Sequence, residues 1–183
     1  MKKALVIVSI LMVAVISTAC INNIAVQELN NKANEYMQKG DYESAMNRLQ
    51  ASLDLDSTMY QTYYNLGIAA INAKKYETAI DALRSGIKIK PEYNDFYYSL
   101  GVAQIALADE IMEEKDEVGE DGKKSEITQE DKDKAVELKR DAIDNLTVYL
   151  QSVPQTPDRE TVEEMIKQSQ EFISPGEGEN SKE

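Results

Sequence analysis

From about residue 26 onward, apolar residues recur at the spacing of amphipathic helices, and the helical segments come in pairs. Short polar turns, such as Lys39-Gly40-Asp41 and Lys74-Lys75, separate the two segments of a pair, so each pair is predicted to be a helical hairpin. The hairpins repeat, because an offset of 34 residues aligns residues of the same kind. The aligned pairs include Tyr42 with Tyr76, Ala45 with Ala79, Leu49 with Leu83, Leu66 with Leu100 and Gly67 with Gly101. A fixed period of this size predicts a solenoid of stacked hairpins.

The residues within each period resemble the tetratricopeptide repeat, in which a large residue, Leu-Gly, an aromatic, Ala, a large residue and Pro follow one another. The middle repeat matches through Tyr63, Leu66-Gly67, Ala79, Leu83 and Pro91. The resemblance covers about residues 26–154 and implies an all-α solenoid of about three helical hairpins. A generic antiparallel bundle is the alternative. Small residues are expected where paired helices cross closely. They are Ala33, Gly67 and Gly101 on the first helices and Ala45, Ala79 and Ala142 on the second helices.

The third repeat is stretched, because Ala142 stands 29 residues beyond its place in an unbroken period. Its first helix is expected to run to about residue 115, and Thr128 is predicted to cap the returning helix. Thr156-Pro157 is predicted to start a further, capping helix. The expected order is a signal peptide over 1–19, a lipidated cysteine and linker over 20–25, repeats over 26–59, 60–93 and 94–154, with an acidic mobile insertion around 116–127, a capping helix over 155–173 and a disordered tail over 174–183.

The amino terminus has the pattern of a targeting segment. Lys2 and Lys3 precede an apolar run over 4–19, which is short for a spanning helix. Ser17-Thr18-Ala19-Cys20 resembles the lipobox of bacterial lipoproteins, and that resemblance implies cleavage before Cys20 and a lipid anchor on its sulfur. A soluble protein with a free thiol and an uncleaved anchor are the alternatives. The predicted location is the bacterial cell envelope, on the periplasmic or extracellular face.

Composition excludes several classes of function. The chain of 183 residues has no histidine and a single cysteine, which excludes Ser-His-Asp triads, disulfide frameworks and CxxC metal sites. The formal net charge of -13 argues against a nucleic-acid partner. A calcium loop over 116–128 fails, because Gly119 and Thr128 fall where ligands should stand. We therefore expect no enzyme, no cofactor and no metal.

The resemblance also implies a concave groove lined by the first helices of the repeats. The groove residues carried over are Gln27, Asn30, Asn34 and Met37, then Gln61, Tyr64, Ile68 and Ile71, then Asp95, Tyr98, Val102 and Ile105. None is basic, which argues against the carboxylate-tail partners of the chaperone-binding members. Tyr64 and Tyr98 are expected to lie side by side, exposed, as anchors for an amphipathic helix or an extended peptide. Alternatively, some of these side chains pack in the core or under the capping helix.

Two functions are compatible with these residues. The first is an adaptor or scaffold, tethered to the membrane through Cys20, that docks a protein or peptide partner in the groove. The second is an accessory of a transport system that captures a small molecule or a glycan. A peptide groove should be an open trough, whereas a small-molecule site should be an enclosed pocket with convergent polar groups.

Overall fold

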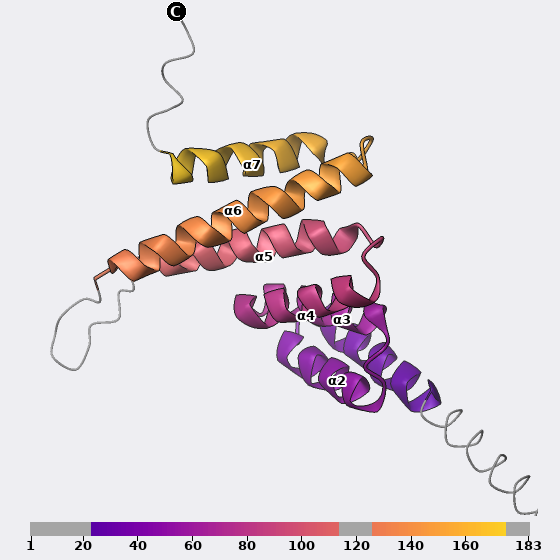
Figure 1. Ribbon diagram of the computed structural model, residues 1–183. Helices are drawn as coiled ribbons and strands as arrows, with labels where there is room; N and C mark the ends of the chain where they lie inside the picture. Colours follow the sequence, from indigo (N-terminus) through magenta and orange to yellow (C-terminus); the bar gives the residue numbers. More distant parts are fainter. Residues whose placement is uncertain (1–22, 114–125, 175–183) are drawn as a thin grey trace, which may run out of the picture.

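A computed structural model describes residues 23–113 and 126–174, and within these ranges every regular element is an α-helix (Figure 1). The predicted signal peptide, Cys20, most of the acidic insertion and most of the predicted tail lie outside the described residues. The helices are residues 23–38, α2 Tyr42–Leu55, α3 Tyr60–Asn72, α4 Tyr76–Ile89, α5 Asp95–Met112, α6 Gln129–Ser152 and α7 Arg159–Ile173. Residues 23–25, expected in the linker, are already helical. No helix in the described ranges combines the length and the apolar character needed to cross a membrane.

The helices form antiparallel hairpins that stack in chain order. Within the described residues each helix packs chiefly against its neighbours in sequence, α3 on α4, α4 on α5, α5 on α6, and α6 on α7. Figure 1 shows α5, α6 and α7 as successive layers beyond α3 and α4. The arrangement is the predicted all-α solenoid of tetratricopeptide hairpins, closed by α7 as a capping helix.

The two polar turns predicted within hairpins have the same backbone structure. Gly40, with φ +74°, and Lys74, with φ +57°, occupy equivalent positions and adopt the left-handed conformation. In each turn the next residue donates its N–H to a carbonyl five positions earlier, Asp41 to Tyr36 and Lys75 to Ala70. This hydrogen-bonding pattern ends a helix and reverses the chain. Lys74 adopts it although only glycine does so without steric cost.

Small residues lie at the crossing within each hairpin. Ala33, Ala45, Ala79 and Ala142 are fully buried. A Cβ atom at Gly67 would lie 2.6 Å from Leu83 Cγ, and a Cβ atom at Gly101 would lie 2.7 Å from Leu146 Cγ. Each leucine therefore fills the space that its glycine leaves open.

Equivalent residues also meet at the junctions between repeats. At the first junction the contact is polar, because the Asn30 amide donates to Ser52 Oγ at 2.7 Å and Thr62 Oγ1 donates to Asn30 Oδ1 at 3.1 Å. Ser52 and Thr62 are fully buried. This hydrogen-bonded node joins the helix over 23–38 to α2 and α3.

At the second junction, the residues 34 positions after Asn30, Ser52 and Thr62 are Tyr64, Gly86 and Phe96. The ring of Tyr64 meets that of Phe96 edge-on, with centroids 5.6 Å apart. Phe96 is fully buried and its ring covers Gly86, where any side chain would collide with it. At the third junction Tyr98 stacks on Tyr149, with centroids 5.3 Å apart. The same position between repeats is therefore filled by hydrogen-bonded polar side chains at the first junction and by aromatic rings at the second and third junctions.

The stretched third repeat extends both of its helices. Thr128 caps α6, as predicted, through a capping box: its hydroxyl accepts from the Asp131 N–H at 3.2 Å, and the Asp131 carboxylate accepts from the Thr128 N–H at 3.0 Å. The helix before the insertion, α5, ends at Met112, about one turn earlier than expected. Figure 1 shows these ends of α5 and α6 reaching beyond α4.

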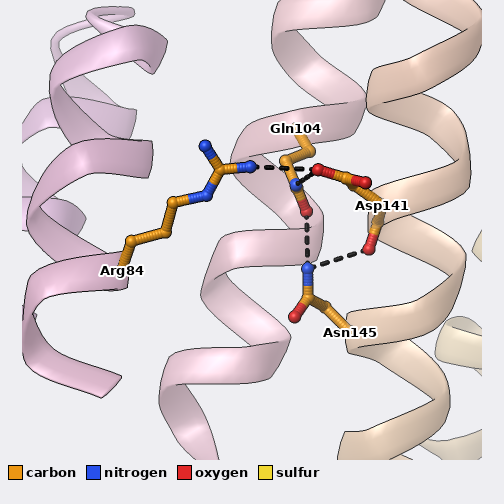
Figure 2. Close-up of polar contacts among 4 residues, drawn as sticks. All are labelled: Arg84, Gln104, Asp141 and Asn145. Carbon is orange, nitrogen blue, oxygen red and sulfur yellow. Dashed lines mark hydrogen bonds and ion pairs between the residues drawn. The ribbon is translucent and has the colours of Figure 1, made fainter. Parts of the chain in front are cut away.

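A polar network ties α6 to the two preceding helices (Figure 2). Gln104 on α5 is fully buried, donates to Asp141 Oδ2 at 3.2 Å and accepts from the Asn145 amide at 2.9 Å. Arg84 on α4 donates to the same Asp141 oxygen at 3.0 Å. Both ends of the buried amide are therefore satisfied by α6.

The capping helix starts later than predicted. The regular helix begins at Arg159 with Asp158 as its N-cap, and Asp158 makes no side-chain capping bond. The Thr156 hydroxyl accepts the Asp158 N–H at 3.4 Å just before the helix and is also paired with the Tyr149 hydroxyl at 2.9 Å in the core. Val162 and Ser169 are the buried residues of α7, which packs against α6.

Candidate binding groove

The predicted groove residues lie on the first helices of the three hairpins, residues 23–38, α3 and α5. Because the hairpins stack in register, residues 34 apart form rows that cross the face. One row is Asn30, Tyr64 and Tyr98, a second is Asn34, Ile68 and Val102, a third is Ile71 and Ile105, and a fourth is Gln61 and Asp95.

The first row belongs to the junctions between repeats. Asn30 is held in the buried polar node, and both tyrosines stack on aromatic rings of the next structural layer. Burial raises the pKa of Tyr64, and its hydrogen bond with Ser99 opposes part of that shift. Burial also raises the pKa of Tyr98, with the negative charge of Asp158 as the next cause. The expectation that Tyr64 and Tyr98 are exposed is wrong, because both are half-buried.

The third row is also used for packing. Ile71 packs against the core between α3, α4 and α5, and Ile105 packs against the core formed with Leu146, Tyr149 and Val162. Because both isoleucine side chains pack into the adjacent helical layer, less of their surface is left to contact a partner. The alternative prediction, that some of the groove residues pack in the core, is therefore correct for this row.

The remaining residues form an open wall. Ile68 and Val102 are half-buried, occupy equivalent positions on α3 and α5, and are not part of the three core clusters of the described chain. Asn34, Gln61 and Asp95 beside them are exposed. We call Asn34, Gln61, Ile68, Asp95 and Val102 the groove wall. It offers apolar contact with amide and carboxylate groups around it, and no cation.

Residues that the sequence did not single out complete this face. Tyr93, just before α5, stacks edge-on against Tyr64 at 5.3 Å and against Phe96 at 5.3 Å. Burial, together with the charge and hydrogen bond of Asp95, raises the pKa of Tyr93 to about 12. The sequence offered one signal, an aromatic residue shortly before the predicted third repeat, but Tyr93 lies outside the helical positions that the repeat pattern assigns to the groove.

Three cavities of the described surface lie elsewhere. Cavities of about 490, 510 and 460 Å³ lie beside the α3–α4 turn, between α6 and α7, and on the outer side of α7. None of these three is lined by a groove-wall residue. Among the described residues, no group of three or more His, Cys, Asp or Glu side chains is arranged to hold a metal ion.

Two family models match the chain, a TPR repeat over residues 33–70 and a tetratricopeptide repeat over residues 60–93. No curated protein sequence matches it. Solved structures share the fold at low identity. The Arabidopsis OM64 TPR domain is 15% identical, with a TM-score of 0.61 over 82% of this chain and 98% of that one. The first TPR of Spaghetti (RPAP3), bound to an HSP90 peptide, is 16% identical, with a TM-score of 0.59 over 81% of this chain and 92% of that one.

A bacterial structure is similar to the same degree. The Yersinia enterocolitica type III secretion chaperone SycD, in complex with a peptide of the translocator YopD, is 16% identical, with a TM-score of 0.57 over 79% of this chain and 91% of that one. The fold and the two family matches define the class, a helical repeat protein. Over residues 33–93 the chain is similar to the tetratricopeptide repeat.

Proposed function

We propose that this protein is a lipid-anchored adaptor of the bacterial cell envelope, which binds a segment of a partner protein along the groove wall. The observation that carries the proposal is the pair Ile68 and Val102, which are equivalent apolar residues on α3 and α5, partly open to solvent and outside the core clusters. Apolar side chains at regular spacing along a helical groove suit an amphipathic helix or an extended peptide.

The shape of the face supports a polypeptide over a small molecule. A small-molecule site encloses its ligand and directs polar groups at it. The polar residues of the groove wall are exposed, and no groove-wall residue lines the three cavities described above. Structures of similar fold support the same class of partner, because RPAP3 and SycD were solved with bound peptides. The groove wall lacks the basic residues that would bind a carboxylate tail.

The envelope location rests on the sequence. The charged residues, the apolar run and the lipobox-like residues before Cys20 support export and lipidation. No catalytic step is part of the proposal, since the chain has no histidine and no recognisable activated nucleophile.

Site-specific photo-crosslinking in intact cells tests the groove. A photoreactive residue at the exposed positions Asn34 or Gln61 should give an adduct with a defined protein. The same residue at Asp81, exposed on α4, should not give it. Adding Val102→Glu should remove the adduct while the far-ultraviolet circular dichroism stays unchanged. An adduct that forms equally from position 81, or that survives Val102→Glu, would show that the partner binds elsewhere.

A further inference from the structure

Half-buried tyrosines and exposed carboxylates border the groove wall and share Asp95 with it. Tyr64 packs edge-on against Tyr93, which lies just before α5, and Tyr98 lies in the first turn of α5. Asp95 lies close enough to raise the pKa of both Tyr64 and Tyr93, and Asp158, before α7, does the same for Tyr98. We call Tyr64, Tyr93, Tyr98, Asp95 and Asp158 the tyrosine–carboxylate surface.

This surface has negative charge that the chain leaves largely unmatched. With its pKa raised to about 12, Tyr93 stays neutral at physiological pH, so the charge comes from the carboxylates. The cation next to Asp158 in the sequence has other partners. Arg159, next to Asp158, pairs with Glu163 at 2.7 Å and donates to the carbonyl of Pro154. Neither Asp95 nor Asp158 takes part in an ion pair found among the described residues.

The chain itself shows how such rings receive a cation. Lys90 Nζ lies 4.6 Å from the ring centroid of Tyr60, which in turn stacks on Tyr93 at 5.4 Å. An ammonium or guanidinium group within about 6 Å of an aromatic face is attracted by the ring, and a carboxylate beside the ring adds to the attraction. Lys90 lies over the Tyr60 ring, whereas Tyr93, next to Asp95, is half-buried and has no cation over its ring among the described residues.

We infer that the segment bound in the groove places a lysine or arginine side chain on the tyrosine–carboxylate surface while its apolar side chains contact Ile68 and Val102. The partner segment is therefore basic and amphipathic. This inference rests on the proposed function, because it specifies what binds in the same groove. Charge complementarity supports it at a larger scale as well, since the chain has 33 acidic against 20 basic residues.

Three synthetic helical peptides test the inference. All have the same leucine face and a fluorescent label, and their polar faces carry lysine, glutamine or glutamate. Fluorescence anisotropy with the purified protein at physiological ionic strength should show the lysine peptide binding about tenfold more tightly than the glutamine peptide. The glutamate peptide should bind most weakly. The double variant Asp95→Asn with Asp158→Asn should abolish the preference for lysine, and asparagine at helix starts should preserve the fold.

A matched double variant controls for net charge. Asp81→Asn with Asp144→Asn removes the same two charges from exposed positions on α4 and α6 and should leave the lysine preference unchanged. Equal binding of lysine and glutamine peptides, or equal losses in both double variants, would overturn the inference. Val102→Glu separates the two proposals. If it abolishes binding of the glutamine peptide while no lysine preference exists, groove binding stands and the basic partner does not. If it changes no peptide's binding, the groove itself is wrong.

Discussion

Phe96 packs closely against Gly86 where the second repeat meets the third. The ring of Phe96 covers Gly86 and takes the space in which a side chain would stand. The equivalent place in the first junction is held by Ser52, opposite the smaller Thr62. The two junctions therefore reach similar packing by exchanging volume between facing positions, which is how close-packed interiors accommodate different residues.

Gly86→Ala tests this fit through the sign of its effect. Helix propensity alone predicts that the change stabilises α4 by about 1 kcal/mol. The collision with Phe96 predicts instead a loss of about 1 to 3 kcal/mol in the free energy of unfolding. Urea denaturation of the variant measures it, and Phe96→Leu in the same chain should recover part of the loss by freeing space. A stabilised Gly86→Ala protein would mean that the ring moves aside easily.

Tyr64 is the residue whose role changes most from the sequence prediction. Because its ring packs on both Tyr93 and Phe96, Tyr64→Ser should lower the free energy of unfolding by roughly 1 to 3 kcal/mol. Tyr64→Phe keeps the ring and loses only the hydrogen bond with Ser99, so we expect about 1 kcal/mol or less. Chemical denaturation compares the two. Equal stability of wild type and Tyr64→Ser would restore the picture of an exposed anchor.

At the scale of elements, the sequence predicted the helices correctly, but it did not predict how deeply individual side chains are buried between them. The 34-residue period places each residue on a face of a hairpin, and the cap pattern at Thr128 correctly indicated where the returning helix begins. The period does not say how far a side chain reaches into the next layer, and this decides whether Tyr64 lines a groove or fills a junction. Thr156 shows the same limit, because its hydroxyl contacts Asp158 next to it in the sequence and also Tyr149 on another helix, and only the first contact could be expected from the sequence.

Lys139 shows the same limit of sequence reasoning. A lysine on an amphipathic helix is ordinarily a surface residue, yet only 7% of this side chain is exposed. Its Nζ lies 2.6 Å from the Asp109 carboxylate and 5.5 Å from the ring centroid of Phe172. The lysine thus joins α5, α6 and α7 at one point. Neither partner is within helical contact distance of it in the sequence, so the pattern of one helix could not reveal them.

The polar network of α6 should stabilise the third repeat through its buried member. Asp141→Ala removes the acceptor of the Gln104 amide, and a buried unpaired donor costs about 1 to 3 kcal/mol. Arg84→Ala removes only a half-exposed ion pair, so its cost should stay below about 1 kcal/mol. Asp144→Ala, exposed on the same helix, is the control for helix propensity. If Arg84→Ala and Asp141→Ala lower the free energy of unfolding equally, the ion pair and not the buried amide is the main stabilising contact of the network.

At the scale of the whole molecule, charge and anchor act in opposite directions. Loss of residues 1–19 would remove two lysines and no acid, which changes the net charge from -13 to -15. Anionic headgroups repel such a surface, so electrostatics alone would keep the protein away from the membrane. Under the proposed lipidation, attachment would come from acyl chains on Cys20. Because residues 23–38 are already helical, the first repeat would begin a few residues from the lipid.

Cys20→Ala should therefore separate the protein from the membrane without changing its fold. The thiol is the atom to which lipid would be joined, so the variant should incorporate no labelled fatty acid and should remain uncut or be redirected. Two or more acyl chains anchor a protein almost irreversibly and one chain only marginally, so loss of the cysteine should abolish stable attachment. Fatty-acid labelling and membrane fractionation measure the outcome, with Asp81→Asn as a labelled control. A Cys20→Ala protein that is labelled and sediments with membranes like the wild type would refute the anchor and leave the groove proposal in place, because the residues that form the groove wall begin only at Asn34.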